Sequence, residues 1–149
     1  MIKMNRKKLG ILLRVLIVSF VLIGGCTCHK NSTKPEPDIQ IIKDISAKEA
    51  YDLIQNNKDN PNFIIIDVRT RGEFADEHIE NAINLDYYSE TFRDELNKLD
   101  KNKIYLIYCR TGRRTGLALD IMEELGFREV YNMLGGITQW KEEGFPTVK

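Results

Sequence analysis

The stretch Ile104-Tyr105-Leu106-Ile107-Tyr108, followed by Cys109-Arg110-Thr111-Gly112-Arg113-Arg114-Thr115, decides the fold. The first five residues form a continuous apolar run, which is typical of a strand buried on both faces of a sheet. The next seven residues are polar and contain a glycine, so the strand ends at Tyr108. An apolar stripe at helical spacing follows, carried by Leu117, Ile121 and Leu125 and joined by Ala118 and Met122. The sequence therefore predicts a strand, a short polar loop and a helix.

The same alternation extends over residues 39–149. Two capping boxes, Ser46 with Glu49 and Thr70 with Glu73, mark the starts of helices. Strands are expected at 39–42, 63–66, 82–85, 104–108 and 129–131, with further helices over 91–99, before Gly126, and from Gly135-Gly136 through Trp140. Alternating strands and helices predict the α/β class, with a single domain built on a central, mostly parallel sheet and helices on both faces.

Cys109 stands where ligands bind in an open α/β sheet, beyond the carboxyl end of a strand and before a helix. Backbone N–H groups in such a loop can converge on an anion, and the helix N-terminus adds roughly half a positive charge. Arg110, Arg113 and Arg114 add full charges. Since these groups favour a thiolate, we expect the pKa of Cys109 to lie below the free value of about 8.5.

The alternative is that Cys109 is a small buried hydrophobe, as free cysteines usually are. The polar run from Arg110 to Thr115 cannot continue a buried apolar strand. It instead provides the positive surroundings that mark reactive thiols. The pattern favours a reactive cysteine.

Three groups of residues now show a resemblance to the rhodanese family. The loop 109–115 resembles the family's Cys-Arg-x-Gly-x-Arg-Ser/Thr active-site loop. Asp67-Val68-Arg69, Glu73-Phe74, His78-Ile79 and Ala82 resemble its Asp-Val-Arg signature, with Glu77 and Asn81 standing where glycine is usual. Gly135-Gly136, Trp140, Gly144 and Pro146 resemble the closing segment. The resemblance covers residues 39–149.

The resemblance implies that Cys109 is the nucleophile of a sulfurtransferase that needs no cofactor. It takes a sulfane sulfur from a small anionic donor such as thiosulfate and passes it to a thiol or cyanide. Arg110 and Arg114 are candidates for gripping the oxyanion of the donor. The substrate-binding residues that the resemblance implies are Arg110, Thr111, Gly112, Arg113, Arg114 and Thr115.

Neighbouring residues are expected to have structural roles. Asp67, at the end of a buried strand, is expected to accept hydrogen bonds. Arg69 and Glu73 are four residues apart and are expected to pair across a helix turn. His78 is expected in a turn, and Trp140 in the core.

Two other functions stay open. A persulfide-relay or binding module without turnover would use an identical loop. A cysteine phosphatase or arsenate reductase of the same fold resembles Cys-x5-Arg, whereas here the last arginine, Arg114, is one position short of that spacing. The loop is therefore tight for a phosphate.

Residues 1–25 read as a signal peptide. Lys3, Arg6, Lys7, Lys8 and Arg14 precede the uncharged run 15–25, a pattern typical of secretion signals. Ile23-Gly24-Gly25-Cys26 resembles the lipobox of bacterial lipoproteins, which implies lipidation of Cys26. An uncleaved anchor helix is the alternative, although the uncharged run is shorter than the roughly 20 residues of a span.

Residues 26–38 are predicted to be a lipidated N-terminus and a flexible tether, and 39–149 the rhodanese-like domain. Both interpretations of the N-terminus place the domain outside the cytoplasm, because positive charge stays inside. The expected location is the bacterial cell envelope, lipid-anchored on the outer side of the cytoplasmic membrane or in the outer membrane facing the periplasm.

Composition excludes several classes of function. Removing the five basic residues of 1–25 leaves 17 basic against 22 acidic residues, a net charge of −5. An acidic domain is poorly suited to nucleic acid. Three cysteines are too few for a disulfide framework, and two histidines, His29 and His78, suggest no metal cluster. The expected partners are small molecules and a membrane.

Overall fold

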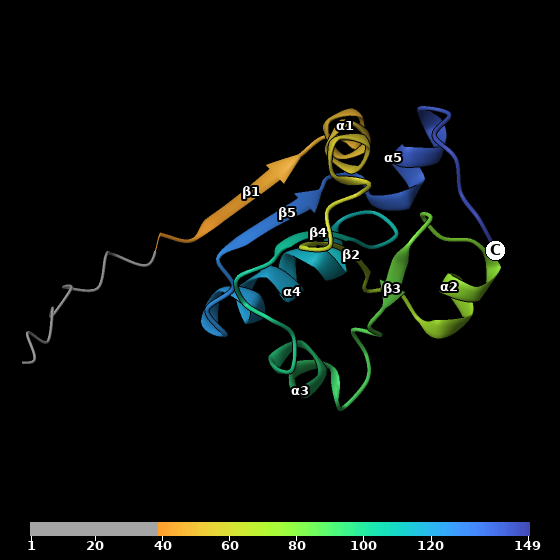
Figure 1. Cartoon of the computed structure of the whole chain (residues 1–149). Coiled ribbons are helices and arrows are strands. Elements are labelled where there is room, and N and C mark those ends of the chain that lie inside the picture. The colour runs from red at the N-terminus through yellow and green to blue at the C-terminus, as the bar shows by residue number, and fades with distance from the viewer. Residues whose placement is uncertain (1–38) are drawn as a thin grey trace, which may run out of the picture. The chain divides into compact units, whose positions relative to one another are not determined.

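A computed structural model describes residues 39–149 as a five-stranded sheet with helices on both faces (Figure 1). The predicted signal peptide, lipidated Cys26 and tether lie outside the described residues. The elements, in chain order, are β1 (Ile41–Ile45), α1 (Ala47–Asn57), β2 (Phe63–Asp67), α2 (Arg71–Asp76), β3 (Ala82–Asn84), α3 (Phe92–Asn97), β4 (Ile104–Tyr108), α4 (Arg113–Glu124), β5 (Glu129–Met133) and α5 (Gly136–Glu142).

The strand order is β1-β5-β4-β2-β3, and every pair of neighbouring strands is parallel. The predicted α/β class and parallel sheet are confirmed. Because β4 lies at the centre, its carboxyl end is flanked by the ends of β2 and β5. The residues that follow these three strands are therefore brought together at one edge of the sheet.

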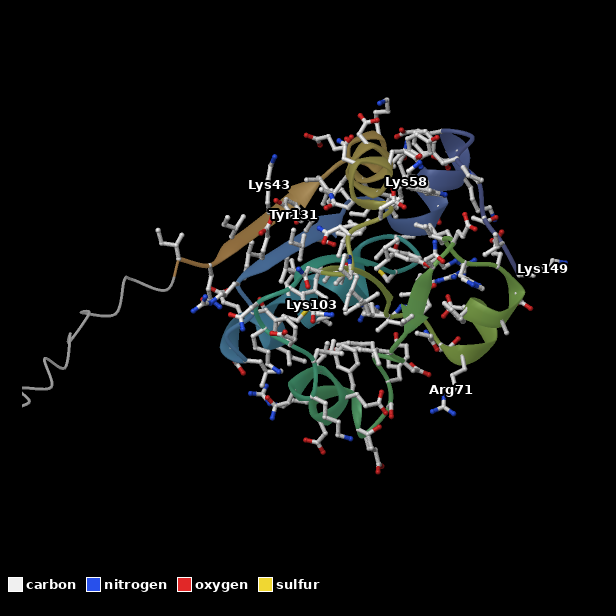
Figure 2. All side chains as sticks on the ribbon, in the orientation of Figure 1. Lys43, Lys58, Arg71, Lys103, Tyr131 and Lys149 are labelled. Atoms are coloured by element: carbon white, nitrogen blue, oxygen red, sulfur yellow. The ribbon has the colours of Figure 1, made fainter. Side chains whose placement is uncertain are left out.

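Alternate side chains of β4 supply two separate cores. Tyr105 and Ile107 pack with α3 and α4 on one face, whereas Leu106 and Tyr108 pack with α1 and α5 on the other. Trp140 of α5 is 2% exposed, which confirms its predicted place in the core. The side chains fill the space between sheet and helices, while the side chain of Arg71 extends outward from α2 (Figure 2). Burial on both faces explains why β4 is a continuous apolar run.

Helix starts follow the sequence signals closely. Both capping boxes are present: Ser46 and Thr70 each accept a hydrogen bond from the N–H of a glutamate three residues later, Glu49 and Glu73. Within the predicted stripe of α4, Ala118 and Met122 are buried as expected, whereas Leu117 differs from the expectation and is 46% exposed. No helix within residues 39–149 has the length and apolar character needed to cross a membrane.

Candidate functional site

Cys109 lies directly after the central strand β4, in the loop that leads into α4. The position predicted from the sequence is thus the one the structure shows. The residue is 1% exposed, so its sulfur lies beneath the loop and not on its surface. On the neighbouring strand Asp67 pairs in register with Tyr108, which brings the residues after β2 alongside the loop.

The sulfur of Cys109 is surrounded by backbone donors. The N–H of Gly112 donates a hydrogen bond to Sγ at 3.1 Å, and the hydroxyl of Thr115 lies 3.8 Å from Sγ. Burial raises the pKa of the Cys109 thiol, but hydrogen bonds from the backbone of Thr115, Gly112 and Thr111 outweigh burial, and the pKa falls below its ordinary value. The predicted direction is confirmed. The chief cause is the loop's backbone, whose hydrogen bonds favour a negatively charged sulfur.

The loop takes this shape because of two glycine positions. Gly112 has a φ of +102°, a backbone conformation that residues other than glycine rarely adopt. Gly136 faces the loop so closely that a Cβ there would lie 2.3 Å from the carbonyl oxygen of Cys109. The N–H of Ile137 donates to the carbonyl of Cys109 at 2.9 Å, and that of Thr138 to the carbonyl of Arg110 at 3.1 Å. The start of α5 therefore supports the loop from behind.

Arg114 points toward α2 and is held there. Its guanidinium donates two hydrogen bonds to the carboxylate of Glu73, at 2.6 and 2.9 Å, and its Cζ lies 5.7 Å from the centre of the Tyr88 ring. Hydrogen bonding to Glu73 raises the pKa of Arg114, so this guanidinium stays charged. Most of its donor capacity is used within the protein.

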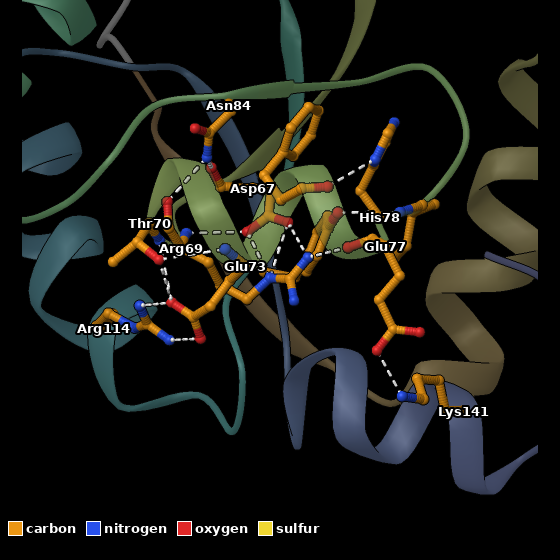
Figure 3. A network of polar contacts seen from close by, with 12 residues as sticks. Asp67, Arg69, Thr70, Glu73, Glu77, His78, Asn84, Arg114 and Lys141 are labelled. Atoms are coloured by element: carbon orange, nitrogen blue, oxygen red, sulfur yellow. Dashed lines mark hydrogen bonds and ion pairs between the residues drawn. The ribbon is translucent and has the colours of Figure 1, made fainter. Parts of the chain in front are cut away.

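The predicted pair of Arg69 with Glu73 is wrong. Arg69 is buried and donates through Nε and Nη2 to the carboxylate of Asp67, while Nη2 also reaches the carbonyl of Glu77 at 2.6 Å (Figure 3). The reason is that Arg69 precedes the N-cap Thr70 and is outside α2, so helical spacing does not apply to it. Asp67, fully buried, is the hydrogen-bond acceptor that the sequence predicted.

The three arginines of the loop therefore have different surroundings. Arg114 is bound to Glu73, whereas Arg110 and Arg113 are exposed and make no ion pair within the described residues. Arg110 lines a cavity of about 620 Å³ between α2 and α5, and Arg113 does not. Among residues 39–149 no group of three or more His, Cys, Asp or Glu could hold a metal ion.

The walls of this cavity, which we call the α2–α5 cavity, come from four parts of the chain. They include the segment before α2, α2 itself, the loop after Cys109, and α5. The lining residues are Arg69, Glu73, Asp76, Glu77, Arg110, Ile137, Thr138, Lys141 and Glu142. The sequence did not predict this cavity, because its walls meet only when the two helices are in place.

The fold and the loop define a class of protein: a parallel α/β domain that holds one cysteine sulfur among backbone donors at the end of its central strand. The rhodanese-like domain family matches residues 46–143, and the chain belongs to that family.

Relatives and solved structures agree with this membership. The thiosulfate sulfurtransferase GlpE of Coxiella burnetii is 34% identical over 101 residues, which cover 68% of this chain and 89% of the relative. A sulfurtransferase of Allochromatium vinosum is 30% identical over 104 residues, 70% of this chain and 95% of the relative. The crystal structure of a rhodanese-related protein from Thermoplasma volcanium superposes with a TM-score of 0.61 at 29% identity, covering 71% of this chain and 97% of that one. Together they support a rhodanese-type sulfurtransferase.

Proposed function

We propose that this protein is an extracytoplasmic sulfurtransferase that moves a sulfane sulfur from a thiosulfate-like donor to a thiol or cyanide through a persulfide on Cys109. The observation that carries the proposal is the hydrogen bond from the Gly112 N–H to Sγ at 3.1 Å, within a loop whose backbone lowers the pKa of the thiol. A thiolate is the nucleophile that sulfur transfer needs.

In the first half-reaction the Cys109 thiolate attacks the outer sulfur of thiosulfate. A bond forms between Sγ and that sulfur, the sulfur–sulfur bond of thiosulfate breaks, and its electron pair leaves with sulfite. The products are a Cys109 persulfide anion and sulfite. The backbone donors of Gly112, Thr111 and Thr115 remain in place to hold the anionic persulfide.

In the second half-reaction an acceptor attacks the outer sulfur of the persulfide. The bond to Sγ breaks, the Cys109 thiolate is restored, and the sulfur leaves on the acceptor. No external oxidant or reductant is required. Because the outer sulfur lies one sulfur–sulfur bond, about 2.05 Å, beyond Sγ, it extends from the buried position of Cys109 toward the substrate.

The test is sulfite release from thiosulfate in the presence of cyanide, with intact mass measured after thiosulfate alone. We expect turnover, and one added sulfur atom on the protein before cyanide is supplied. Cys109→Ala should abolish both, and its unchanged thermal unfolding would show that the fold remains. A protein that neither turns over nor gains a sulfur atom would refute the proposal.

A relay module is the second candidate, favoured by the 1% exposure of Cys109, which restricts access to the sulfur. A persulfide that forms but is not passed to cyanide would support the relay. A phosphatase is less well supported, because the loop is one residue short and Arg114 is bound to Glu73. Hydrolysis of an aryl phosphate would revive that function.

The location outside the cytoplasm rests on the sequence of residues 1–38 alone. The intact mass of the full-length protein, isolated from the membranes of a bacterial host, tests it directly. We expect a lipid-modified chain that begins at Cys26. A protein of unprocessed mass in the soluble fraction would contradict this part of the proposal.

A further inference from the structure

The α2–α5 cavity is larger than the proposed small substrates require. Its volume is about 620 Å³, within the roughly 300–1,000 Å³ typical of sites for organic ligands. Thiosulfate and cyanide are far smaller than such ligands. Arg110, which directly follows Cys109, and Ile137, whose N–H donates to the Cys109 carbonyl, both line the cavity, so the cavity lies beside the backbone of Cys109. It therefore has room for an organic acceptor.

Most charges in the cavity wall are already neutralised by partners. Arg69 is paired with Asp67, Glu73 with Arg114, and Lys141 with Glu77 (Figure 3). Each of these side chains keeps its partner without any ligand. They shape the cavity but leave little net charge for recognition.

Three charges in the wall have no ion pair within residues 39–149, and they have both signs. Arg110 is the cation, on the loop beside Cys109. Asp76 and Glu142 are the anions, and they are the last residues of α2 and α5. All three side chains are exposed. A ligand that fits this arrangement carries an anionic group toward Arg110 and a cationic group toward Asp76 and Glu142.

We propose that the α2–α5 cavity binds the sulfur acceptor and that the acceptor is a small zwitterionic thiol with a carboxylate and an ammonium group. This proposal rests on the proposed function, because it concerns the second half-reaction. The carboxylate pairs with Arg110, the residue that follows Cys109 in the chain. The same guanidinium faces the sulfonate of the donor in the first half-reaction, and sulfite leaves before the acceptor binds.

The transfer itself is balanced without another reactant. The acceptor thiol gives its proton to the anionic persulfide of Cys109, and the resulting thiolate attacks the outer sulfur and forms a new sulfur–sulfur bond. The bond to Sγ breaks, and its electron pair stays on the Cys109 thiolate. The proton remains on the transferred sulfur, so the product is a protonated persulfide of the acceptor.

Four thiols test the proposal on full-length protein loaded with persulfide: cysteine, cysteamine, 3-mercaptopropionate and 2-mercaptoethanol. Cysteine carries both charged groups, cysteamine only the ammonium, 3-mercaptopropionate only the carboxylate, and 2-mercaptoethanol neither. The single-turnover rate of sulfur loss is measured for each thiol, and each variant is compared with the natural protein. Comparing variant with natural protein for one thiol at a time cancels the intrinsic reactivity of that thiol.

We expect Arg110→Gln to slow sulfur transfer to cysteine and to 3-mercaptopropionate about threefold to fivefold, which is what an accessible ion pair contributes. The rates with the other two thiols should be unchanged. The double variant Asp76→Asn/Glu142→Gln should slow sulfur transfer to cysteine and to cysteamine by a similar factor. Arg71→Gln, which removes an exposed charge of α2 outside the cavity, is the matched control and should change none of the four rates.

The outcomes separate the two proposals. If persulfide never forms, the proposed function itself fails. If persulfide forms and every variant changes all four rates by one common factor, the sulfurtransferase remains and the zwitterionic acceptor is refuted. An effect of Arg71→Gln equal to that of Arg110→Gln would also refute it, since long-range charge would then explain the rates.

Discussion

The carboxylate of Glu73 binds the guanidinium of Arg114 at 2.6 and 2.9 Å, although they are 41 positions apart in the chain. The same carboxylate accepts hydrogen bonds from the N–H and hydroxyl of Thr70, which completes the capping box of α2. One side chain thus fixes the start of α2 and ties it to the first turn of α4. The Glu73–Arg114 pair is partly buried, with side-chain exposures of 28% and 12%.

Glu73→Gln should lower the free energy of unfolding by roughly 1.5–3 kcal/mol, as expected for hydrogen bonds to a charged group. The loss follows because glutamine supplies one acceptor oxygen where the carboxylate supplies two. Denaturant unfolding measures it. Glu124→Gln is the control, since Glu124 and Arg93 form an exposed pair and should contribute no more than about 1 kcal/mol. Equal effects of the two variants would contradict a special role for Glu73.

The same pair predicts a pH dependence. Hydrogen bonding to Arg114 lowers the pKa of Glu73 from 4.5 to about 2. Because the folded protein favours the carboxylate, the stabilisation is complete above pH 4.5 and is lost as the pH falls toward 2. The difference in unfolding free energy between the natural protein and Glu73→Gln should therefore shrink over this interval. A constant difference would show that the carboxylate is not responsible.

Local signals in the sequence predicted much of this site. The apolar run 104–108 predicted the bounds of β4, and both capping boxes predicted the starts of helices. These predictions succeeded because strands buried on two faces and helix N-termini have strong local sequence requirements. The position of Cys109 followed from these elements. Such features depend on neighbours within a few residues.

Contacts between distant segments were not predictable in the same way. The sequence spacing suggested that Glu73 would pair with Arg69, but Glu73 binds Arg114 on another helix. The chief cause of the lowered pKa of Cys109 is the loop's backbone and not the guanidinium charges emphasised by the sequence. The α2–α5 cavity exists only once two helices meet. Each depends on tertiary geometry, which residue types alone do not encode.

Gly112→Ala should make Cys109 less reactive. Alanine at a φ of +102° costs about 1–2 kcal/mol, and relief of that strain would move the N–H away from Sγ. The pKa of the thiol should then rise, and alkylation of Cys109 at neutral pH, followed by peptide mass spectrometry, should slow. Gly116→Ala is the control, because Gly116 is inside α4 with no atom near the added Cβ. Unchanged alkylation in Gly112→Ala would argue against the backbone donor.

Gly136→Ala should disrupt the loop from behind. Its Cβ would meet the carbonyl oxygen of Cys109 at 2.3 Å and the carbonyl carbon of Arg110 at 2.6 Å, so backbone must move. Gly144→Ala has a similar positive φ but open space around the Cβ, and it isolates the conformational cost of about 1–2 kcal/mol. We expect Gly136→Ala to be clearly more destabilising in thermal unfolding and to lose sulfur loading. Equal unfolding temperatures would mean that the contact is easily relieved.

The two departures from the family signature should behave differently. Asn81 has a φ of +63°, which asparagine tolerates and glycine favours, whereas Glu77 has an extended φ of −166° that any residue adopts. Asn81→Ala should therefore cost about 1 kcal/mol and Asn81→Gly nearly nothing. Glu77→Gly should be destabilising, because glycine relieves no backbone strain at this extended φ and the ion pair with Lys141 is lost. Denaturant unfolding of the three variants checks this, and a stabilising Glu77→Gly would contradict it.

Arg110 should matter more for thiosulfate than Arg113, although both are exposed and neighbour the same sulfur in sequence. Arg110 lines the α2–α5 cavity whereas Arg113 does not, and Arg114 is bound to Glu73, so Arg110 is the loop guanidinium in that cavity that is free to pair with the donor's sulfonate. We expect Arg110→Gln to raise the KM for thiosulfate about fivefold to tenfold, as for the loss of one charge-assisted contact. Arg113→Gln should change it less than twofold at physiological salt, because distant exposed charges are screened. Steady-state kinetics with cyanide as acceptor measure both. A larger effect of Arg113→Gln would place the sulfonate over the N-terminus of α4 instead of in the cavity.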